Sequence, residues 1–334
     1  MKHVFEGKTI LVTGGCGSIG SEIIRQILKY DPDSIRVFDS SEEGQFNLSQ
    51  TIQSEKVRYL IGDIRKVERV RLAMKDVDIV FHAAALKHVP LCEYNPFEAV
   101  TTNVIGTNNL VHAAIDEGVE KFIGISTDKA VDPVNTMGAT KLLSEKIITN
   151  APLGSSKIKF CCVRFGNVLN SSGSVIPIFK RQIETGNTIT ITDNNMTRFF
   201  MDLPEAVNLV LKAAEKVEGG EIFILKMKAL KIKDIAEVMV EELAPKHGKN
   251  ASEFSYKVIG IRPGEKLNES LLTKEETAYT AEEQDMYILR NSLLANHESK
   301  IKPQITPIAQ ITSATTELLG KEEIRKIFRE KKLV

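Results

Sequence analysis

The chain has no tryptophan and only 4 cysteines among its 334 residues, and it carries no excess of either charge. Lysine plus arginine equals aspartate plus glutamate at 44 each, so no overall field favours nucleic acid or an anionic membrane. A negatively charged ligand must therefore be bound by local positive charge. We expect neither nucleic acid nor a membrane among the partners.

Long apolar runs are missing as well. No stretch approaches the roughly 18 to 20 apolar residues that cross a bilayer, and the first three residues do not open a signal peptide. Cys161 and Cys162 are adjacent in an expected strand, which is a poor geometry for a mutual disulfide. Cys16 and Cys92 have no metal-type spacing. These features predict a reducing, cytoplasmic location.

The chain does contain a regular alternation of strand and helix patterns. Between apolar runs of strand length, helical patterns such as Ile23, Ile24, Ile27 and Leu28 recur at core spacing. Repeated βα units predict a doubly wound α/β fold, with a parallel sheet covered by helices on both faces. The strands are expected at residues 9–12, 35–38, 57–61, 79–82, 122–125 and 160–164.

A glycine-rich turn follows the first expected strand. Gly14, Gly17 and Gly20 form a G-x-x-G-x-x-G pattern between a strand and an amphipathic helix, the context that supports a dinucleotide fingerprint. Glycine permits a tight turn and lets the backbone approach a pyrophosphate at the helix N-terminus. We expect Ser18 and Ile19 to contact the cofactor together with these glycines.

Asp39 ends the second expected strand, 19 positions after Gly20. A carboxylate there can accept hydrogen bonds from an adenosine ribose and would repel a 2′-phosphate, so we expect NAD rather than NADP. The alternative is that Asp39 only caps the segment that follows. Asp63 and Ile64, after the third strand, are expected near the adenine.

The fourth expected strand leads into a run of small residues. Ala83 would let a cofactor lie close to the strand end, and Lys87 can reach a phosphate or a sugar of cofactor or substrate. His82 and His88 are one histidine at a strand end and one in a loop, which are more often ordinary polar residues than ligands. We therefore predict no metal.

Reactive side chains are concentrated after the fifth expected strand. The segment 126–129, Ser-Thr-Asp-Lys, places a hydroxyl, an acid and an amine in consecutive positions, and Lys141 lies on the helix that follows. Open α/β sheets bind ligands at the carboxyl ends of their strands, so we place the chemistry here. A solvated turn with an incidental ion pair is the alternative. The buried face of the helix is expected to hold Leu142, Leu143, Ile147 and Ile148.

With these motifs the sequence resembles an extended short-chain dehydrogenase/reductase, and most closely the nucleotide-sugar 4,6-dehydratases of bacterial polysaccharide and flagellin-glycan pathways. The superfamily usually carries Tyr-x-x-x-Lys; here Met137 holds the tyrosine position and Lys141 is in place. Several subgroups of the dehydratase family also carry methionine there. The matching segments are residues 83–90, 126–141, 164–177, 196–199 and 262–266, within about 5–290.

The resemblance implies a Rossmann-like enzyme that uses NAD to dehydrate UDP-N-acetylglucosamine to a UDP-4-keto-6-deoxy-hexosamine. C4 is oxidised, water is eliminated across C5 and C6, and hydride returns to C6. The implied roles are Lys129 as the C5 base, Asp128 as the C6 acid, Thr127 as the group that orients the C4 hydroxyl, and Lys141 as a cation beside the nicotinamide ribose. A simple ion pair between Asp128 and Lys129 would oppose both of their roles. Met137 has no proton to exchange, so the acceptor of the C4 proton stays open between a water and Lys129.

The second half of the chain resembles the UDP-sugar side of this family. Asn167 matches a substrate contact, while Arg262 and Glu265 can hold a phosphate and the uridine ribose. Surface salt bridges are the ordinary alternative for such charges. The loop at 171–177 is expected to face the diphosphate. Besides Lys87, the other expected substrate contacts are Ser174, Val175, Pro177, Lys180, Thr190 and Arg198.

The two halves are expected to interleave, because residues 221–225 look like another strand of the first sheet. We assign 1–165 and about 201–250 to dinucleotide binding, and about 166–200 and 251–290 to a smaller α/β substrate domain. Residues 291–334 are expected to be a C-terminal helical segment, with helices near 308–319 and 324–328, and the protein is expected to form a homo-oligomer.

Two other functions compete with dehydration. A UDP-sugar 4-epimerase would share the fold, the cofactor and C4 oxidation, but normally relies on the tyrosine that Met137 replaces. A non-catalytic NAD-binding regulator would have lost the chemistry, which the presence of Asp128, Lys129 and Lys141 opposes.

Overall fold

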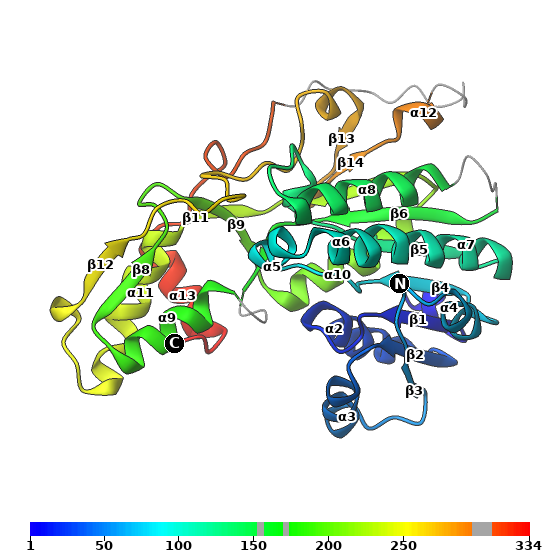
Figure 1. The fold of residues 1–334 in the computed structure, drawn as a ribbon, viewed down its shortest axis with the longest axis horizontal. Helices are drawn as coiled ribbons and strands as arrows, with labels where there is room; N and C mark the ends of the chain where they lie inside the picture. Colours follow the sequence, from blue (N-terminus) through cyan, green and yellow to red (C-terminus); the bar gives the residue numbers. More distant parts are fainter. Residues whose placement is uncertain (152–156, 170–173, 296–308) are drawn as a thin grey trace.

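The computed structural model describes residues 1–151, 157–169, 174–295 and 309–334. Its largest element is a nine-stranded sheet with the order β13-β14-β10-β6-β5-β4-β1-β2-β3 (Figure 1). The strands from β10 to β3 are parallel, and β14 pairs antiparallel with β10 and β13. The bounds are β1 Thr9–Thr13, β2 Ser34–Asp39, β3 Val57–Ile61, β4 Ile79–His82, β5 Lys121–Ile125, β6 Lys159–Arg164, β10 Glu221–Leu225, β13 Thr280–Glu282 and β14 Met286–Leu289. All seven strands predicted for this sheet are confirmed.

Helices cover both faces of this sheet, as predicted. On one face α2 packs against α10, while α4, α7 and α8 pack side by side on the other. The helices alternate with the strands because each βα unit must return the chain to the same edge of a parallel sheet. The bounds are α2 Ser18–Ile27, α3 Glu42–Thr51, α4 Val67–Met74, α5 Val89–Tyr94, α6 Pro96–Ala99, α7 Thr107–Glu117, α8 Thr136–Asn150 and α10 Leu203–Lys216.

The predicted buried face of α8 is confirmed for Ile148, which is buried, and for Ile147, which packs against the core, but it is wrong for Leu143. Leu143 is 50% exposed, whereas the polar residues Lys141, Ser144 and Glu145 are buried. Each of the three has a partner inside the protein: Lys141 and Ser144 donate to main-chain carbonyls, and Glu145 pairs with a buried arginine. A buried polar group is tolerated when it is hydrogen-bonded, so tertiary partners override the apolar pattern here.

A second, smaller hydrophobic cluster lies beside the large sheet, on the left in Figure 1. It contains residues of helices α9, α11 and α13 and of the two-stranded sheet β12-β8. One face of the three-stranded sheet β11-β9-β7 contributes Phe200 and Leu230 to it, while Phe199 and Ala229 belong to the large cluster. The bounds are β7 Asn167–Val168, α9 Val175–Thr185, β8 Thr188–Ile191, β9 Thr197–Met201, β11 Lys228–Lys231, α11 Ile232–Leu243, β12 Ser255–Val258 and α13 Lys321–Glu330.

Two of the expected domain limits differ from this arrangement. Helix α11 was assigned to the dinucleotide side, yet its apolar residues pack in the smaller cluster, because the β9–β11 pairing carries the chain out of the large sheet. The segment that forms β13 and β14 was assigned to the substrate side, yet it pairs onto the large sheet. This pairing covers the edge of β10, which would otherwise expose free backbone groups.

The expected helix near 308–319 is also not formed over its described residues. This segment makes isolated bridges to Ala229 and Ser270. Leu319 N–H donates to the carbonyl of Ala229, and Ser313 N–H to that of Glu269. Because its backbone groups bond to other segments, they cannot close helical turns. The second C-terminal helix is confirmed as α13. No helix in the described part of the chain is long and apolar enough to span a membrane.

Candidate active site

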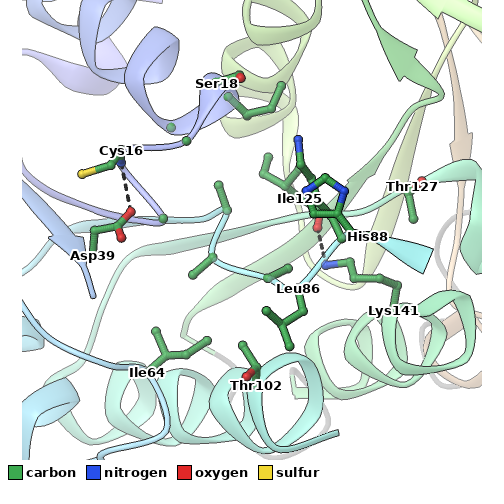
Figure 2. A pocket seen from close by; sticks show the side chains of 18 of the residues that line it. Cys16, Ser18, Asp39, Ile64, Leu86, His88, Thr102, Ile125, Thr127 and Lys141 are labelled. Atoms are coloured by element: carbon green, nitrogen blue, oxygen red, sulfur yellow. Dashed lines mark hydrogen bonds between the residues drawn. The ribbon is translucent and has the colours of Figure 1, made fainter. Parts of the chain in front are cut away.

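A cavity of about 780 Å³ lies along the carboxyl ends of the parallel strands β1, β2, β4 and β5 (Figure 2). Both the glycine turn and the reactive segment after β5 contribute to its wall. The predicted site residues that line it are Gly14, Gly17, Ser18, Ile19, Gly20, Asp39, Asp63, Ile64, Ala83, Lys87, Thr127, Lys129, Lys141 and Asn167. Residues far apart in the sequence are therefore brought to one site.

Two positions of the glycine turn, Gly14 and Gly20, have no room for a side chain. Gly14 has a φ of +66°, and a Cβ there would lie 2.6 Å from the main-chain nitrogen of Ala84. A Cβ on Gly20 would lie 2.3 Å from the Gly14 carbonyl oxygen. Gly17 precedes the first turn of α2, so the positive end of the helix dipole lies at the glycine turn. This cradle fits the pyrophosphate of a dinucleotide.

Asp39 faces the glycine turn from the end of β2 (Figure 2). Its two carboxylate oxygens accept hydrogen bonds from Cys16 N–H and Ser41 N–H, each at 3.0 Å. Burial, reinforced by the Asp39 charge, raises the pKa of the Cys16 thiol to about 12. The residue that caps α3 is Ser41, whose hydroxyl accepts from Gly44 N–H at 3.0 Å, so Asp39 is not the helix cap.

Three other residues of the expected cofactor side also line this cavity. The Asp63 carboxylate pairs with Arg65 at 2.6 Å, and this hydrogen-bonded pairing lowers the pKa of Asp63. Ile64 lies next to it along the wall. Burial lowers the pKa of Lys87. All three side chains therefore belong to the wall of the cavity.

The wall opposite the glycine turn carries Thr127, Lys129, Met137 and Lys141. Lys141 Nζ donates to the main-chain carbonyl of Ile125 at 2.7 Å (Figure 2), and burial lowers the pKa of this amine. Met137 is 3% exposed and packs in an apolar cluster of its own. The tyrosine position therefore holds a thioether at the cavity wall, with no proton to transfer.

Asp128 and Lys129 form an ion pair, the arrangement that opposes their expected roles as acid and base. Lys129 Nζ donates to Asp128 Oδ1 at 3.0 Å and to Asn167 Oδ1 at 3.4 Å, and Thr127 Oγ1 also donates to Asp128 Oδ1 at 3.0 Å. Burial acts to lower the pKa of Lys129, but the Asp128 and Glu269 carboxylates outweigh it and raise that pKa. In this state Lys129 is an ammonium. Asp128 is fully buried and does not line the cavity.

The segment 262–266 contacts the reactive stretch. Asn135 Nδ2 donates to the Gly264 carbonyl at 2.7 Å, and Lys266 Nζ donates to the Val131 carbonyl at 2.6 Å. Arg262 is exposed, and its guanidinium lies 3.9 Å from the Glu265 carboxylate. The block is therefore adjacent to the site without lining the cavity, and the substrate roles of Arg262 and Glu265 stay predictions.

The remaining predicted substrate contacts lie away from the cavity wall. Ser174, Val175, Pro177 and Lys180 lie at the N-terminal end of α9, while residues 171–173 of the same predicted loop lie outside the described residues. Thr190, on β8, pairs with Gln182 through its hydroxyl and its N–H. The substrate roles of these residues likewise stay predictions.

Arg198 is also away from the cavity wall and is buried. Its guanidinium donates to three main-chain carbonyls, at 2.7 to 3.0 Å, rather than pointing into the cavity. Its role as a substrate contact stays a prediction.

Sequence reasoning missed two buried charge clusters. Glu269 lies 3.6 Å from Lys129 and 3.7 Å from Arg198. Arg164, fully buried, pairs with Glu145 at 2.7 Å and Glu276 at 2.9 Å, which ties α8 to the chain after Leu271. For Glu269, the available signal was an acid just before the apolar pair Leu271 and Leu272, shortly after the 262–266 block.

The parallel sheet, the glycine cradle and Asp39 at the end of β2 define a Rossmann-like protein of the extended short-chain dehydrogenase/reductase class. The chain belongs to the polysaccharide biosynthesis protein family, whose model matches residues 10–291. It is 53% identical over 333 residues to an uncharacterized membrane protein of Methanocaldococcus jannaschii, covering 99% of this chain and 98% of the relative.

Relatives with named activities point in two directions. A UDP-N-acetylglucosamine 4,6-dehydratase (inverting) of Campylobacter jejuni is 42% identical over 301 residues, or 89% of this chain and 87% of that protein. A UDP-glucose 4-epimerase of Rickettsia rickettsii is 40% identical over 334 residues, or 97% and 96%.

Among solved structures, Pen from Bacillus thuringiensis is 42% identical with a TM-score of 0.92, covering 99% of both chains. A double mutant of DesIV, a dTDP-glucose 4,6-dehydratase from Streptomyces venezuelae solved with NAD bound, is 25% identical with a TM-score of 0.68. That match covers 77% of this chain and 86% of DesIV.

Proposed function

We propose that this protein is an NAD-dependent UDP-N-acetylglucosamine 4,6-dehydratase that forms a UDP-4-keto-6-deoxy-hexosamine. The observation that carries the proposal is the contact between Lys129 and Asp128 at 3.0 Å, with Lys129 on the wall of the cavity that also holds the glycine cradle. An acid beside an amine suits the removal of water from neighbouring carbons. The dehydratase relative from Campylobacter jejuni supports the substrate class.

Residues of this structure fit NAD. The turn at Gly14 and Gly20 has no side chains in the way of a pyrophosphate at the N-terminus of α2, and Asp39 presents carboxylate oxygens to a ribose. When bound, NAD supplies the oxidation at C4 and the return of hydride to C6. Lys141, at the opposite wall, is positioned to hold the nicotinamide ribose.

Lys129 and Asp128 must exchange a proton before they can act. Transfer from Lys129 Nζ to Asp128 Oδ1 converts ammonium and carboxylate into amine and carboxylic acid, with no change in total charge. Burial favours the neutral pair, because desolvation penalises both charged forms. The amine then takes the C5 proton and the acid protonates the departing C6 hydroxyl, which leaves the ion pair seen here. Thr127 orients the C4 hydroxyl.

A direct assay tests the proposal. The purified protein is incubated with UDP-N-acetylglucosamine and NAD, and the product is weighed by mass spectrometry. Dehydration lowers the mass of the sugar nucleotide by one water. Unchanged mass with a new C4 stereoisomer would show an epimerase, and unchanged substrate would contradict both activities. NMR of the product formed in deuterated water reports the configuration at C5.

The epimerase is the second candidate, favoured by the Rickettsia rickettsii relative named for that activity. It needs a group that exchanges the C4 hydroxyl proton, and Met137 replaces the tyrosine that normally does so. It also has no use for an acid and an amine placed to eliminate water. The Asp128–Lys129 pair and the methionine at position 137 therefore favour dehydration.

A further inference from the structure

Glu269 is a buried carboxylate next to the reactive segment. It is 3% exposed, and its backbone is fixed by the C-terminal segment: its N–H donates to Ser313 Oγ at 3.0 Å, and its carbonyl accepts from Ser313 N–H at 2.8 Å. Ser313 Oγ also lies 2.7 Å from Thr197 Oγ1. The carboxylate is thus placed by contacts among three segments that are distant in the sequence.

The side chain of Glu269 faces two cations. Oε1 lies 3.6 Å from Lys129 Nζ and 3.7 Å from Arg198 Nε, while Oε2 has no hydrogen-bond partner in the described part of the chain. Lys129 lines the cavity and Glu269 does not, so Glu269 lies behind the amine. A buried carboxylate oxygen without a partner costs stability, which points to a role other than holding the fold.

We propose that Glu269 is a positioning residue for Lys129, fixing its amine at the cavity wall and supplying the counter-charge when that amine takes a proton. The inference rests on the proposed function, in which Asp128 begins the elimination as a neutral acid. At that moment Asp128 offers Lys129 no negative charge, and Glu269 is the carboxylate that remains. A fixed charge that faces a developing cation in a buried site stabilises it without reorganisation.

The charged groups that act on Lys129 are Asp128, Glu269 and Arg198, and they set the sign of the expected change. The two carboxylates favour the ammonium and Arg198 disfavours it. Replacing Glu269 by glutamine removes one favourable charge and leaves Asp128 as the carboxylate that offsets burial and Arg198. The pKa of Lys129 should therefore fall, and its neutral, reactive form should be more abundant at any pH below that pKa.

Competitive acetylation reads this charge state without requiring turnover. The purified protein is treated with trace acetic anhydride at pH 8, and the labelling of Lys129 is measured by peptide mass spectrometry relative to the exposed Lys326. Glu269→Gln should raise the relative labelling of Lys129 by about tenfold or more, since each unit of pKa changes the neutral fraction tenfold. Glu269→Asp keeps the negative charge, so the relative labelling of Lys129 in this variant should lie between the values for Glu269→Gln and the wild type.

The matched control is Glu282→Gln, which removes an exposed carboxylate paired with Lys226 and should leave Lys129 labelling unchanged. Circular dichroism checks the fold of each variant. Equal labelling in the wild type, Glu269→Gln and Glu269→Asp would overturn the proposal, as would Lys129 in the wild type labelling as fast as Lys326.

Turnover gives a second, separable result. With UDP-N-acetylglucosamine, Glu269→Gln should slow product formation and C5 deuterium exchange together, with KM little changed, and Glu269→Asp should recover part of the rate. A wild-type protein that does not dehydrate this substrate would contradict the proposed function, while the labelling result would still decide the role of Glu269. Normal turnover in Glu269→Gln would overturn the inference.

Discussion

The two ends of the cavity are built differently. At the glycine end, Gly14, Gly17, Gly20 and Asp39 come from a single βαβ unit, and the contacts are mostly made by main-chain atoms. At the lysine end, the charged groups around Lys129 come from segments as distant as β9 and the chain beyond β12, and the contacts are made by side chains.

Because of this difference, the glycine end should be sensitive to the size of a side chain and the lysine end to its charge. The glycine end depends on space, because a side chain at Gly14 or Gly20 would collide with a neighbouring backbone. The lysine end depends on the balance of two carboxylates and one guanidinium around one amine. Substitutions at the glycine end should impair cofactor binding, whereas substitutions of the charged groups around Lys129 should impair catalysis with little effect on cofactor binding.

Replacing Lys129 by alanine should give the largest loss. Removing a general base typically costs ~10²–10⁴ in rate, and NAD affinity should be retained because the residue lies away from the glycine end. Product formation and C5 hydrogen exchange in deuterated water should stop together. In Asp128→Asn, exchange should persist without product, because the base remains. Near-normal dehydration by a folded Lys129→Ala protein would contradict the assigned chemistry.

Gly14→Ala should disrupt the other end of the cavity. The new Cβ would lie 2.6 Å from the Ala84 nitrogen at a φ of +66°, so both a collision and left-handed strain are expected. Calorimetry should show NAD affinity lost by tenfold or more. Gly118→Ala is the matched control: its φ is +70°, but nothing lies within 4 Å of the added Cβ. Gly118→Ala should lower the free energy of unfolding by the backbone strain alone, roughly 1–2 kcal/mol, and NAD binding should stay normal.

Two substitutions at the lysine end should have different effects: Lys141→Ala removes a charge, and Met137→Ala removes a buried apolar side chain. Loss of the Lys141 cation, which bonds the Ile125 carbonyl at 2.7 Å, should lower kcat roughly ten- to a hundredfold, the range for hydrogen bonds to charged groups. Met137→Ala should keep measurable dehydration but lower the free energy of unfolding by about 2–5 kcal/mol, as for other buried methionines. The reverse pattern would contradict the assignment of this helix.

The cofactor preference should follow from Asp39. Its carboxylate would repel a 2′-phosphate, so the protein should bind NAD more tightly than NADP in a direct titration. Asp39→Asn removes the charge and keeps the side-chain shape, so it should reduce the difference between the affinities for NAD and NADP. Tighter binding of NADP to the wild type would mean that Ser40 and Ser41 hold the phosphate instead.

The smallest effect concerns Cys16. Because burial and Asp39 raise the pKa of its thiol to about 12, only about one thiol in 10⁴ is ionised at pH 8. Alkylation by iodoacetamide should be slow at pH 8 and faster as the pH rises toward that pKa. Asp39→Asn should speed it at pH 8, and the buried Cys92, Cys161 and Cys162 serve as internal references. An unchanged alkylation rate of Cys16 in Asp39→Asn would mean that the Asp39 carboxylate does not raise the pKa of this thiol.

Local motifs predicted much of the molecule. The seven strands of the large sheet and the glycine turn follow from short apolar runs and glycine spacing, because these patterns depend on neighbours along the chain. On α8 the same rules predicted the burial of Ile148 but missed the buried polar residues. There, Ser144 and Glu145 are buried against partners that the helix pattern cannot reveal, and the expected helix near 308–319 instead bonds to Ala229 and Glu269.

The sequence by itself determined the fold class, the family resemblance and the presence of Thr127, Asp128 and Lys129 after the fifth strand. Tertiary structure decided that Lys129 is paired with Asp128 and faces Glu269, and that Arg198 is buried away from the cavity wall. The physical reason is range. Backbone patterns act over a few residues, whereas the charge of a buried amine is set by groups within a few ångströms, whatever their distance along the chain.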